Sequence, residues 1–214
     1  IIGFCPKDDG FLISNSSGMN FFGDGSIQPV NLPKELEGNT ISSLFYDNKV
    51  LYVGTESKGF FILKETGKNN FSLIHHVNKI GETEIKTIVT NIKKQASSGT
   101  IYLSLYGEGI VSISDFDVKL LNTENKILPT NDILSIHVKG DDLWIGTVGM
   151  GVLKMDTKNN SIKQFTKADG YTSTNVYCIE ELNGQVVLGS IDDGLFIYDG
   201  SKFKNFTRKD GLLS

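Results

Sequence analysis

Short apolar runs, each closed by a turn signal, recur along the whole chain. Residues 174–210 hold four such runs, and the breaks between them are Asn183-Gly184, Asp192-Asp193-Gly194 and Asp199-Gly200. Asn-Gly and Asp-Gly pairs favour tight hairpins, because they tolerate the positive φ that such hairpins need. This segment therefore predicts a four-stranded antiparallel meander.

The pattern inside the runs indicates which strands are covered. Residues 143–145 and 186–188 are consecutive apolar residues in second strands, whereas residues 203–206 alternate in a fourth strand. A strand that is apolar on both faces must be covered on both faces. Small sheets packed face to face, with half-exposed outer strands, are typical of β-propeller blades. No segment shows the 3.6-residue period that a helical solenoid would require.

A five-residue step from a small residue to a glycine marks each copy. It runs from Gly54 to Gly59, with later copies at Ser104–Gly109, Gly146–Gly151 and Gly189–Gly194, and a weaker copy lies within 11–22. A repeat of about 40–50 residues decides the architecture. We expect an all-β fold, a β-propeller of four-stranded antiparallel blades, as a single domain over 1–214. The approximate blades are 1–39, 40–80, 81–127, 128–170 and 171–210. Five blades fit either a closed five-bladed ring or part of a ring of about seven.

The two small residues of each step have different expected roles. The first lies near the end of the second strand, where its size lets the neighbouring blade approach closely. The second opens the third strand, where a positive φ is expected. A phosphate-binding loop would need a helix directly after the glycines, and none is predicted.

Composition narrows the class of protein. The 214 residues carry a net charge of −4 with acidic and basic residues mixed, so a nucleic-acid partner is not expected. No apolar run is long enough to span a membrane, so no membrane contact by this segment is expected. Cys5 and Cys178 each lie among apolar residues. We expect two buried free thiols, with a bridge between them as the open alternative.

The chain shows no catalytic or metal-binding motif, so we expect no enzyme activity, no metal and no cofactor. His75 and His76 are adjacent on a strand and point to opposite faces, so they cannot share one metal. His137 is expected to be a hydrogen-bonded residue of a first strand. Acid pairs such as Asp192-Asp193 are expected to form turns. Trp144 is expected to pack between blades, since its strand is apolar on both faces.

Ligand-binding residues are expected on two kinds of loop at one end of the blades. These loops join the second strand to the third, or lead into the next first strand. The candidates are Tyr106, Glu108, Met150, Tyr171, Asp192 and Asp193. Aromatic rings and carboxylates of this kind suit a sugar, and an ordinary solvated rim is the alternative.

Two longer signatures carry a family resemblance. LWIGTVGMGVLKMD (143–156) is followed by FTKADGY (165–171), and VVLGSIDDGLFIYD (186–199) by FTRKDGL (206–212). LYVGTESKGFFIL (51–63) matches the first half. These segments resemble the two-component regulator propeller repeat of the extracytoplasmic sensor regions of bacterial sensor and hybrid histidine kinases.

The resemblance implies a ligand-sensing input domain in the periplasm, which would bind a small molecule or an oligosaccharide on its loop face. An open arc of five blades would expose two apolar sheet faces, so self-association or docking to further propeller blades or domains is expected. Two alternatives stay open at this point: a protein-interaction scaffold without a small ligand, and a propeller hydrolase or lyase. Ligand identity, the number of blades in the ring and the presence of downstream kinase domains cannot be read from the sequence.

Overall fold

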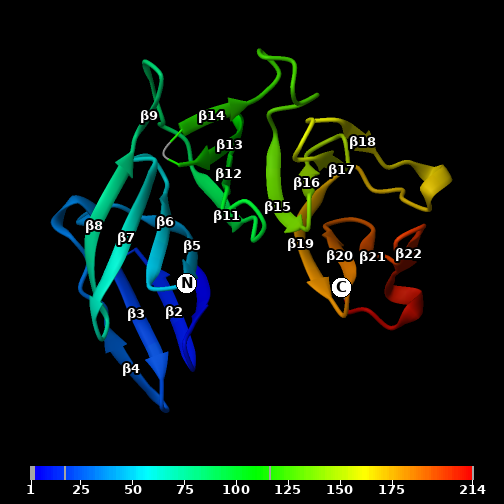
Figure 1. Cartoon of the computed structure of the whole chain (residues 1–214). Helices are drawn as coiled ribbons and strands as arrows, with labels where there is room; N and C mark the ends of the chain where they lie inside the picture. Colours follow the sequence, from blue (N-terminus) through cyan, green and yellow to red (C-terminus); the bar gives the residue numbers. More distant parts are fainter. Residues whose placement is uncertain (1–2, 17, 116, 214) are drawn as a thin grey trace. The chain divides into compact units, whose positions relative to one another are not determined.

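The computed structural model describes residues 3–16, 18–115 and 117–213, which form strands, tight turns and three short 3-10 turns (Figure 1). By its internal contacts the chain divides into two compact units, 1–92 and 93–214. The boundary falls inside β11 (Val89–Lys94). Each unit is described by itself below, and the expectation of a single domain stays a prediction.

The first unit contains two four-stranded antiparallel sheets in simple meander order. Blade 1 consists of β1 (Phe4–Lys7), β2 (Gly10–Asn15), β3 (Gly18–Gly23) and β4 (Ser26–Pro29). Blade 2 consists of β5 (Ile41–Asp47), β6 (Val50–Thr55), β7 (Phe60–Gly67) and β8 (Asn70–Val77). A small hairpin that the sequence did not predict follows, formed by β9 (Lys79–Ile80) and β10 (Thr83–Glu84).

Three further sheets follow in the same order, so the all-β fold with five four-stranded propeller blades is confirmed. Blade 3 consists of β11, β12 (Ile101–Leu105), β13 (Gly109–Ser114) and β14 (Asp117–Leu121). Blade 4 consists of β15 (Ile133–Lys139), β16 (Asp142–Thr147), β17 (Val152–Asp156) and β18 (Ile162–Gln164). Blade 5 consists of β19 (Val176–Leu182), β20 (Gln185–Ser190), β21 (Gly194–Tyr198) and β22 (Phe203–Phe206).

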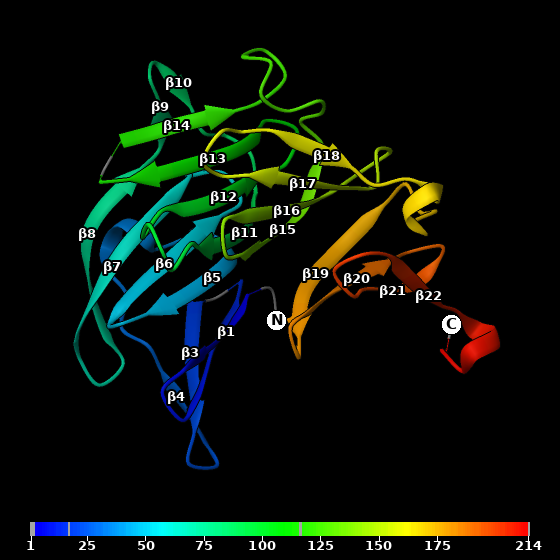
Figure 2. The ribbon, with the colours of Figure 1, turned by 45° about the vertical axis from the view of Figure 1, so that its right-hand side comes forward.

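The apolar residues of neighbouring blades form the cores. We call the face of a blade that points toward the next blade its following face, and the opposite one its preceding face. In the second unit, the sheets of blades 4 and 5 lie one after the other (Figure 2). The following face of blade 4 and the preceding face of blade 5 share one buried cluster, which contains Trp144, Val152, Phe165, Tyr171, Ile179, Val186, Leu188, Phe196 and Phe203.

The first glycine of the step sits where blades touch. A Cβ on Gly54 would lie 2.2 Å from Ser43 Oγ and 2.7 Å from Val89 Cβ of blade 3. A Cβ on Gly146 would likewise lie 2.7 Å from Val176 O of blade 5. Contacts this short are not compatible with a side chain, so the expected close approach is confirmed. The second glycine has positive φ in every copy, for instance +73° at Gly151.

Hydroxyl groups beside these glycines fasten one blade to the next. Ser43 Oγ donates to Val89 O at 2.8 Å, and Ser135 Oγ donates to Val176 O at 3.3 Å. In both cases the acceptor is the first residue of the next blade's first strand. Inside a core these hydroxyls give the two carbonyls a hydrogen-bond partner from the neighbouring blade.

The FTKADGY signature forms a defined turn after blade 4. Thr166 caps the 3-10 turn Lys167–Asp169, and the Asp169 carboxylate accepts from Thr166 N at 2.9 Å, which completes a capping box. Gly170 then takes a left-handed conformation with φ of +83°. The FTRKDGL segment repeats the arrangement with Arg208–Asp210 as its 3-10 turn. The Asp-Gly turn expected from the sequence is therefore present, with an additional threonine cap.

Candidate functional site

The hairpins between second and third strands are held rigidly at their base. Thr147 Oγ1 donates to Gly151 O at 2.9 Å and accepts from Met150 N at 3.2 Å, and Thr147 is fully buried. Thr55 makes the equivalent pair of bonds in blade 2. In blade 5, Ser190 Oγ accepts from Asp193 N at 3.3 Å. The threonine or serine after the first glycine is thus a hairpin lock, which sequence reasoning missed although "GT" and "GS" recur.

The hairpins between the second and third strands of blades 3, 4 and 5 form the candidate site, which we call the hairpin face. Thr147 and Ser190 lock the last two hairpins, whereas blade 3 has Leu105 at the equivalent position. Each tip exposes one large apolar side chain: Tyr106 at 49%, Val148 at 40% and Ile191 at 65%. Glu108 and Asp192 are exposed, whereas Met150 and Asp193 are half-buried. The topology places these tips at the same end of three consecutive blades. The face therefore offers apolar contacts flanked by carboxylates.

Tyr171 does not belong to this face, which corrects the sequence prediction. Its side chain is only 2% exposed and packs between blades 4 and 5, with its ring centroid 4.8 Å from that of Phe196 and 5.1 Å from that of Phe203. The residue follows the Gly170 turn, which directs the chain inward. Its ring is part of the core and is not accessible to a ligand at the surface.

Trp144 is also a core residue, as expected. It is 2% exposed, and its ring stacks on Phe165 with a centroid distance of 5.2 Å. Tyr198 of blade 5 approaches the same ring at 5.2 Å. Stacking on a bound sugar is thereby excluded for this indole in the described arrangement.

A second polar feature lies on the first strands of blades 3, 4 and 5, and we call it the first-strand cluster. Lys93 Nζ contacts Glu180 Oε1 at 2.8 Å. His137 lies between two carboxylates, with Nδ1 3.6 Å from Glu180 Oε2 and Nε2 3.8 Å from Glu181 Oε2. Lys139 contacts Glu181 at 3.4 Å. Among the described residues, neither ring nitrogen of His137 has a hydrogen-bond partner within bonding distance, so the expected hydrogen bond is absent and the two carboxylates lie slightly farther away.

The electrostatics of this cluster limit its chemistry. The His137 ring and the Lys93 ammonium lower the pKa of Glu180 to about 2, against an opposing effect of burial. A carboxylate held ionised in this way is a poor proton donor near neutral pH, so Glu180 does not suit the acid role of a glycoside-cleaving pair. The charges of the cluster are paired with one another, and the network links three consecutive first strands.

The remaining histidines and cysteines form no metal site. His76 stacks on Phe61 and contacts Lys58 O at 2.7 Å. In the part of the chain that the structure describes, no three His, Cys, Asp or Glu side chains are placed to hold a metal ion. Cys5 is a buried free thiol whose pKa is raised to about 12 by burial. Cys178 is also free but exposed, which corrects the expectation of two buried thiols.

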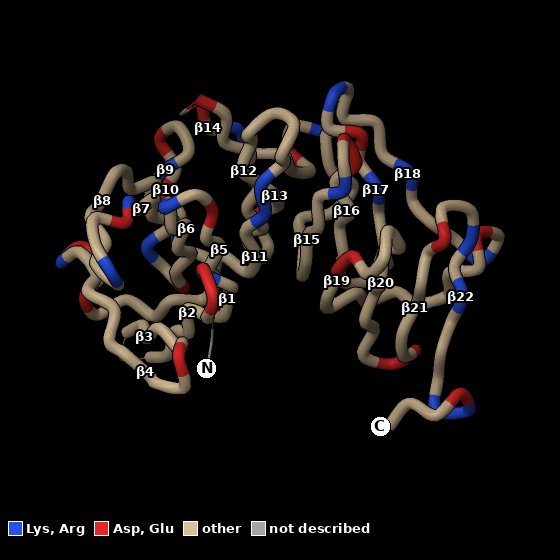
Figure 3. Tube along the Cα trace, turned by 60° about the horizontal axis from the view of Figure 1, so that its bottom comes forward, with Lys and Arg blue, Asp and Glu red and all other residues tan. Residues whose placement is uncertain are grey.

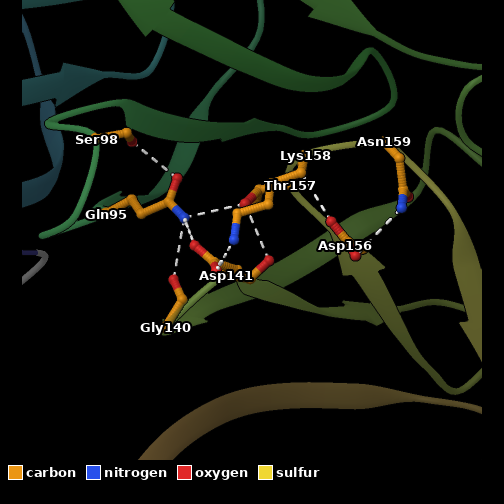
Figure 4. Close-up of polar contacts among 8 residues, drawn as sticks. All are labelled: Gln95, Ser98, Gly140, Asp141, Asp156, Thr157, Lys158 and Asn159. Carbon is orange, nitrogen blue, oxygen red and sulfur yellow. Dashed lines mark hydrogen bonds and ion pairs between the residues drawn. The ribbon is translucent and has the colours of Figure 1, made fainter.

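The turn end of the second unit, opposite the hairpin face, carries a buried polar clamp (Figure 4). Gln95, at the end of β11, is 4% exposed, and its Nε2 donates to Gly140 O and to Thr157 Oγ1 of blade 4, both at 3.0 Å. Ser98 Oγ donates to Gln95 Oε1 at 2.9 Å. The clamp is fully occupied by groups of the protein, so we assign it to blade packing.

Surface charge is mixed in both units. Lys and Arg alternate with Asp and Glu along the turns and outer strands, without a long segment of one sign (Figure 3). Among the described residues, none lies in a helix of the length and hydropathy that crossing a bilayer requires.

Comparison with known proteins shows that this chain is similar in fold, but not closely in sequence, to several solved structures. No family model matches the chain, and no curated protein matches its sequence. The extracellular domain assigned to the hybrid two-component system BT3049 from B. thetaiotaomicron aligns over 95% of this chain with 18% identity and a TM-score of 0.73. The extracellular domain assigned to BT4673 of the same organism aligns over 94% with 14% identity and a TM-score of 0.70. The WD40 β-propeller domain of Doa1 aligns over 95% with 16% identity and a TM-score of 0.71.

The fraction of each matched structure that this chain covers differs between the matches. The chain covers 29% and 28% of the two extracellular domains and 66% of the Doa1 domain, so it spans less than a third of the length of either extracellular domain. The chain is therefore similar in fold to part of the extracellular propeller regions of two-component proteins and to a WD40 propeller.

Proposed function

We propose that this chain is part of an extracytoplasmic sensor region of a bacterial two-component signalling protein. The observation that carries the proposal is the resemblance of its repeat signatures to the two-component regulator propeller repeat. The fold similarity to the BT3049 and BT4673 extracellular domains over nearly the whole chain supports it. The partly paired acids of the first-strand cluster give no independent support for an enzyme.

The hairpin face is the proposed ligand site. Tyr106 supplies an aromatic surface for the apolar face of a sugar ring, and Glu108, Asp192 and Asp193 supply acceptors for hydroxyl groups. The hairpin locks at Thr147 and Ser190 hold the tips in place before a ligand arrives, which reduces the entropy cost of binding. The proposed ligand is a small molecule or an oligosaccharide. Its binding would bias a neighbouring domain between two states.

Calorimetric titration with a panel of neutral and acidic oligosaccharides tests this proposal. We expect one panel member to bind and the Tyr106→Ala and Asp192→Asn variants to weaken its binding by about tenfold each. Ile74→Ala is the matched control, because Ile74 is an exposed apolar residue of an outer strand and belongs to none of these hairpins. Binding that is unchanged in both hairpin variants would place the ligand elsewhere, and no binding by any sugar would contradict the proposal.

A second function is favoured by the apolar tips themselves. Tyr106, Val148 and Ile191 expose three large apolar side chains on consecutive hairpins, and such patches suit a protein partner. Affinity capture with the natural host's lysate separates the two functions. A partner retained by wild type, lost with Ile191→Asp and retained with Asp192→Asn would favour the scaffold.

A further inference from the structure

A cavity of about 490 Å³ lies at the turn end of the joint between blades 4 and 5. Blade 4 contributes Lys139, Trp144 and Lys154 to its lining, and blade 5 contributes Tyr198 and Gly200. All of its lining residues belong to the second unit. Its volume falls within the range of about 300–1,000 Å³ that is usual for small-molecule sites.

One buried polar group in the lining of this cavity has no partner. Trp144 is 2% exposed, and its Nε1 forms no hydrogen bond with any residue that the structure describes. An indole N–H can only donate, and a buried donor that stays unpaired destabilises a fold. The group therefore requires an acceptor that the described residues of the two blades do not supply.

The repeat explains why an acceptor is missing at this joint. In blade 3, Tyr102 occupies the position of Trp144, and its hydroxyl interacts with Thr157 of blade 4. Thr157 Oγ1 also accepts from Gln95 Nε2 at 3.0 Å. In blade 5 the residue at the position of Thr157 is Gly200. Because glycine has no side chain, the joint between blades 4 and 5 lacks this hydroxyl and the volume that it would fill.

Two lysines add further donors to the same cavity. Lys154 Nζ contacts Asp142 Oδ2 at 3.0 Å, whereas Lys139 donates to Gly184 O and lies 3.4 Å from Glu181 Oε1. An ammonium group has three N–H donors, so each lysine retains at least one for another acceptor. The two side chains are 34% and 30% exposed for Lys139 and Lys154, so they can shift as a ligand enters.

We propose that this cavity binds a small organic carboxylate. An ionised carboxylate only accepts hydrogen bonds, so it can pair with the Trp144 N–H and with the ammonium groups of Lys139 and Lys154 at the same time. Tyr198 donates its hydroxyl to Gly200 O at 2.9 Å, which leaves its ring as an apolar wall for the rest of the ligand. The site lies at the end opposite the hairpin face and does not depend on the function proposed for that face.

A nuclear magnetic resonance titration with sodium benzoate tests this proposal. Trp144 is the chain's single tryptophan, so its indole N–H gives one isolated signal that reports on the proposed donor. We expect benzoate to shift this signal until it saturates, because the N–H gains a charged acceptor. Benzyl alcohol has the same ring without the carboxylate and should cause no saturable shift.

Variants identify the groups that hold the carboxylate. Lys139→Gln and Lys154→Gln should each weaken benzoate binding about tenfold, since each removes a charged donor. Lys158→Gln is the matched control, because Lys158 lies at the same end of blade 4, is 71% exposed and pairs with Asp141 outside the cavity. It should leave the affinity unchanged.

Trp144→Phe retains an aromatic ring and removes the N–H donor. Calorimetry should show benzoate binding about tenfold weaker than in wild type, and circular dichroism checks that each variant is folded. If this variant does not fold, the two lysine variants decide. The proposal would be overturned by an indole signal that benzoate does not shift, by an equal response to benzyl alcohol, or by unchanged affinity in both lysine variants.

Discussion

The hydroxyl of Ser135 occupies the space that a side chain on Gly146 would need, since a Cβ added to Gly146 would lie 2.4 Å from Ser135 Oγ. The same hydroxyl bonds to Val176 O in the next blade. The strand residue and its glycine therefore act together, because the serine can reach the neighbouring blade only where the opposite position is empty.

Gly146→Ala should destabilise the second unit. The added methyl would push Ser135 from its position and would also meet Val176 O at 2.7 Å, so we expect a loss of about 1–3 kcal/mol in the free energy of unfolding. Urea unfolding measures it. Gly67→Ala is the matched control: its nearest neighbour would be 3.5 Å away, and its φ lies outside the left-handed region. Equal stability of the two variants would contradict the close approach.

Trp144→Ala should remove a large part of the core between blades 4 and 5. Truncation of a fully buried tryptophan is expected to cost about 3–5 kcal/mol, whereas Val148→Ala at an exposed hairpin tip should stay within about 0.5 kcal/mol. Trp144 is the chain's single tryptophan, so its fluorescence reports this core directly. Strong quenching of the native protein by acrylamide would show that the indole is accessible.

Gln95→Ala should loosen the turn-end clamp between blades 3 and 4. The change removes the donor to Gly140 O and Thr157 Oγ1 in a buried position, and we expect a loss of about 1–3 kcal/mol in the free energy of unfolding. Gln164 also donates a side-chain hydrogen bond, to Met150 O at 2.9 Å, but is exposed. Gln164→Ala should therefore change stability by less than about 0.5 kcal/mol. A similar loss in both variants would refute the role of burial.

Stability should fall in acid partly through Glu180. Its pKa is lowered from an ordinary value of about 4.5 to about 2 in the folded protein, so its ionised form stabilises the fold above about pH 4.5. This contribution should decrease as the pH falls from about 4.5 to about 2. The side chain is 69% exposed, so solvent screening keeps the effect modest.

The measurement is urea unfolding at a series of pH values. Glu180→Gln should have a flatter profile than wild type in this window, and Glu124→Gln, which alters an exposed carboxylate outside the cluster, should follow the wild type. Identical profiles for wild type and Glu180→Gln would show that the cluster does not hold Glu180 ionised.

The fold could be predicted from the sequence because its signals are local. The turn pairs, the glycine steps and the doubly apolar strands act within a few residues, and these set the hairpins and their covered faces. The hairpin locks at Thr147 and Ser190 were readable in the same way, as a hydroxyl residue repeated after the small residue. Tyr171 was misplaced because a single left-handed glycine turned it into the core.

The first-strand cluster could not be predicted, since its members come from different blades. Lys93 and Glu180 are 87 residues apart, and only the stacking of three sheets brings them to 2.8 Å. His137 was recognised as a polar residue of a first strand, but its two carboxylate neighbours depend on the same stacking. The hairpin face could be predicted in part. The repeat locates its loops, but it does not indicate which molecule the loops bind.

The side chains that join the blades stand at fixed positions near the first strands. Where the blade 4 hairpin tip takes part, it does so through its backbone, since Gly149 N donates to Asn175 Oδ1 at 3.0 Å. A tip can therefore accumulate substitutions, or be exchanged for another sequence, without loosening the joints. Duplication of one blade likewise supplies both halves of a new joint at once. The architecture thus separates the parts that must stay the same from those free to change, so new recognition properties can arise by editing loops alone.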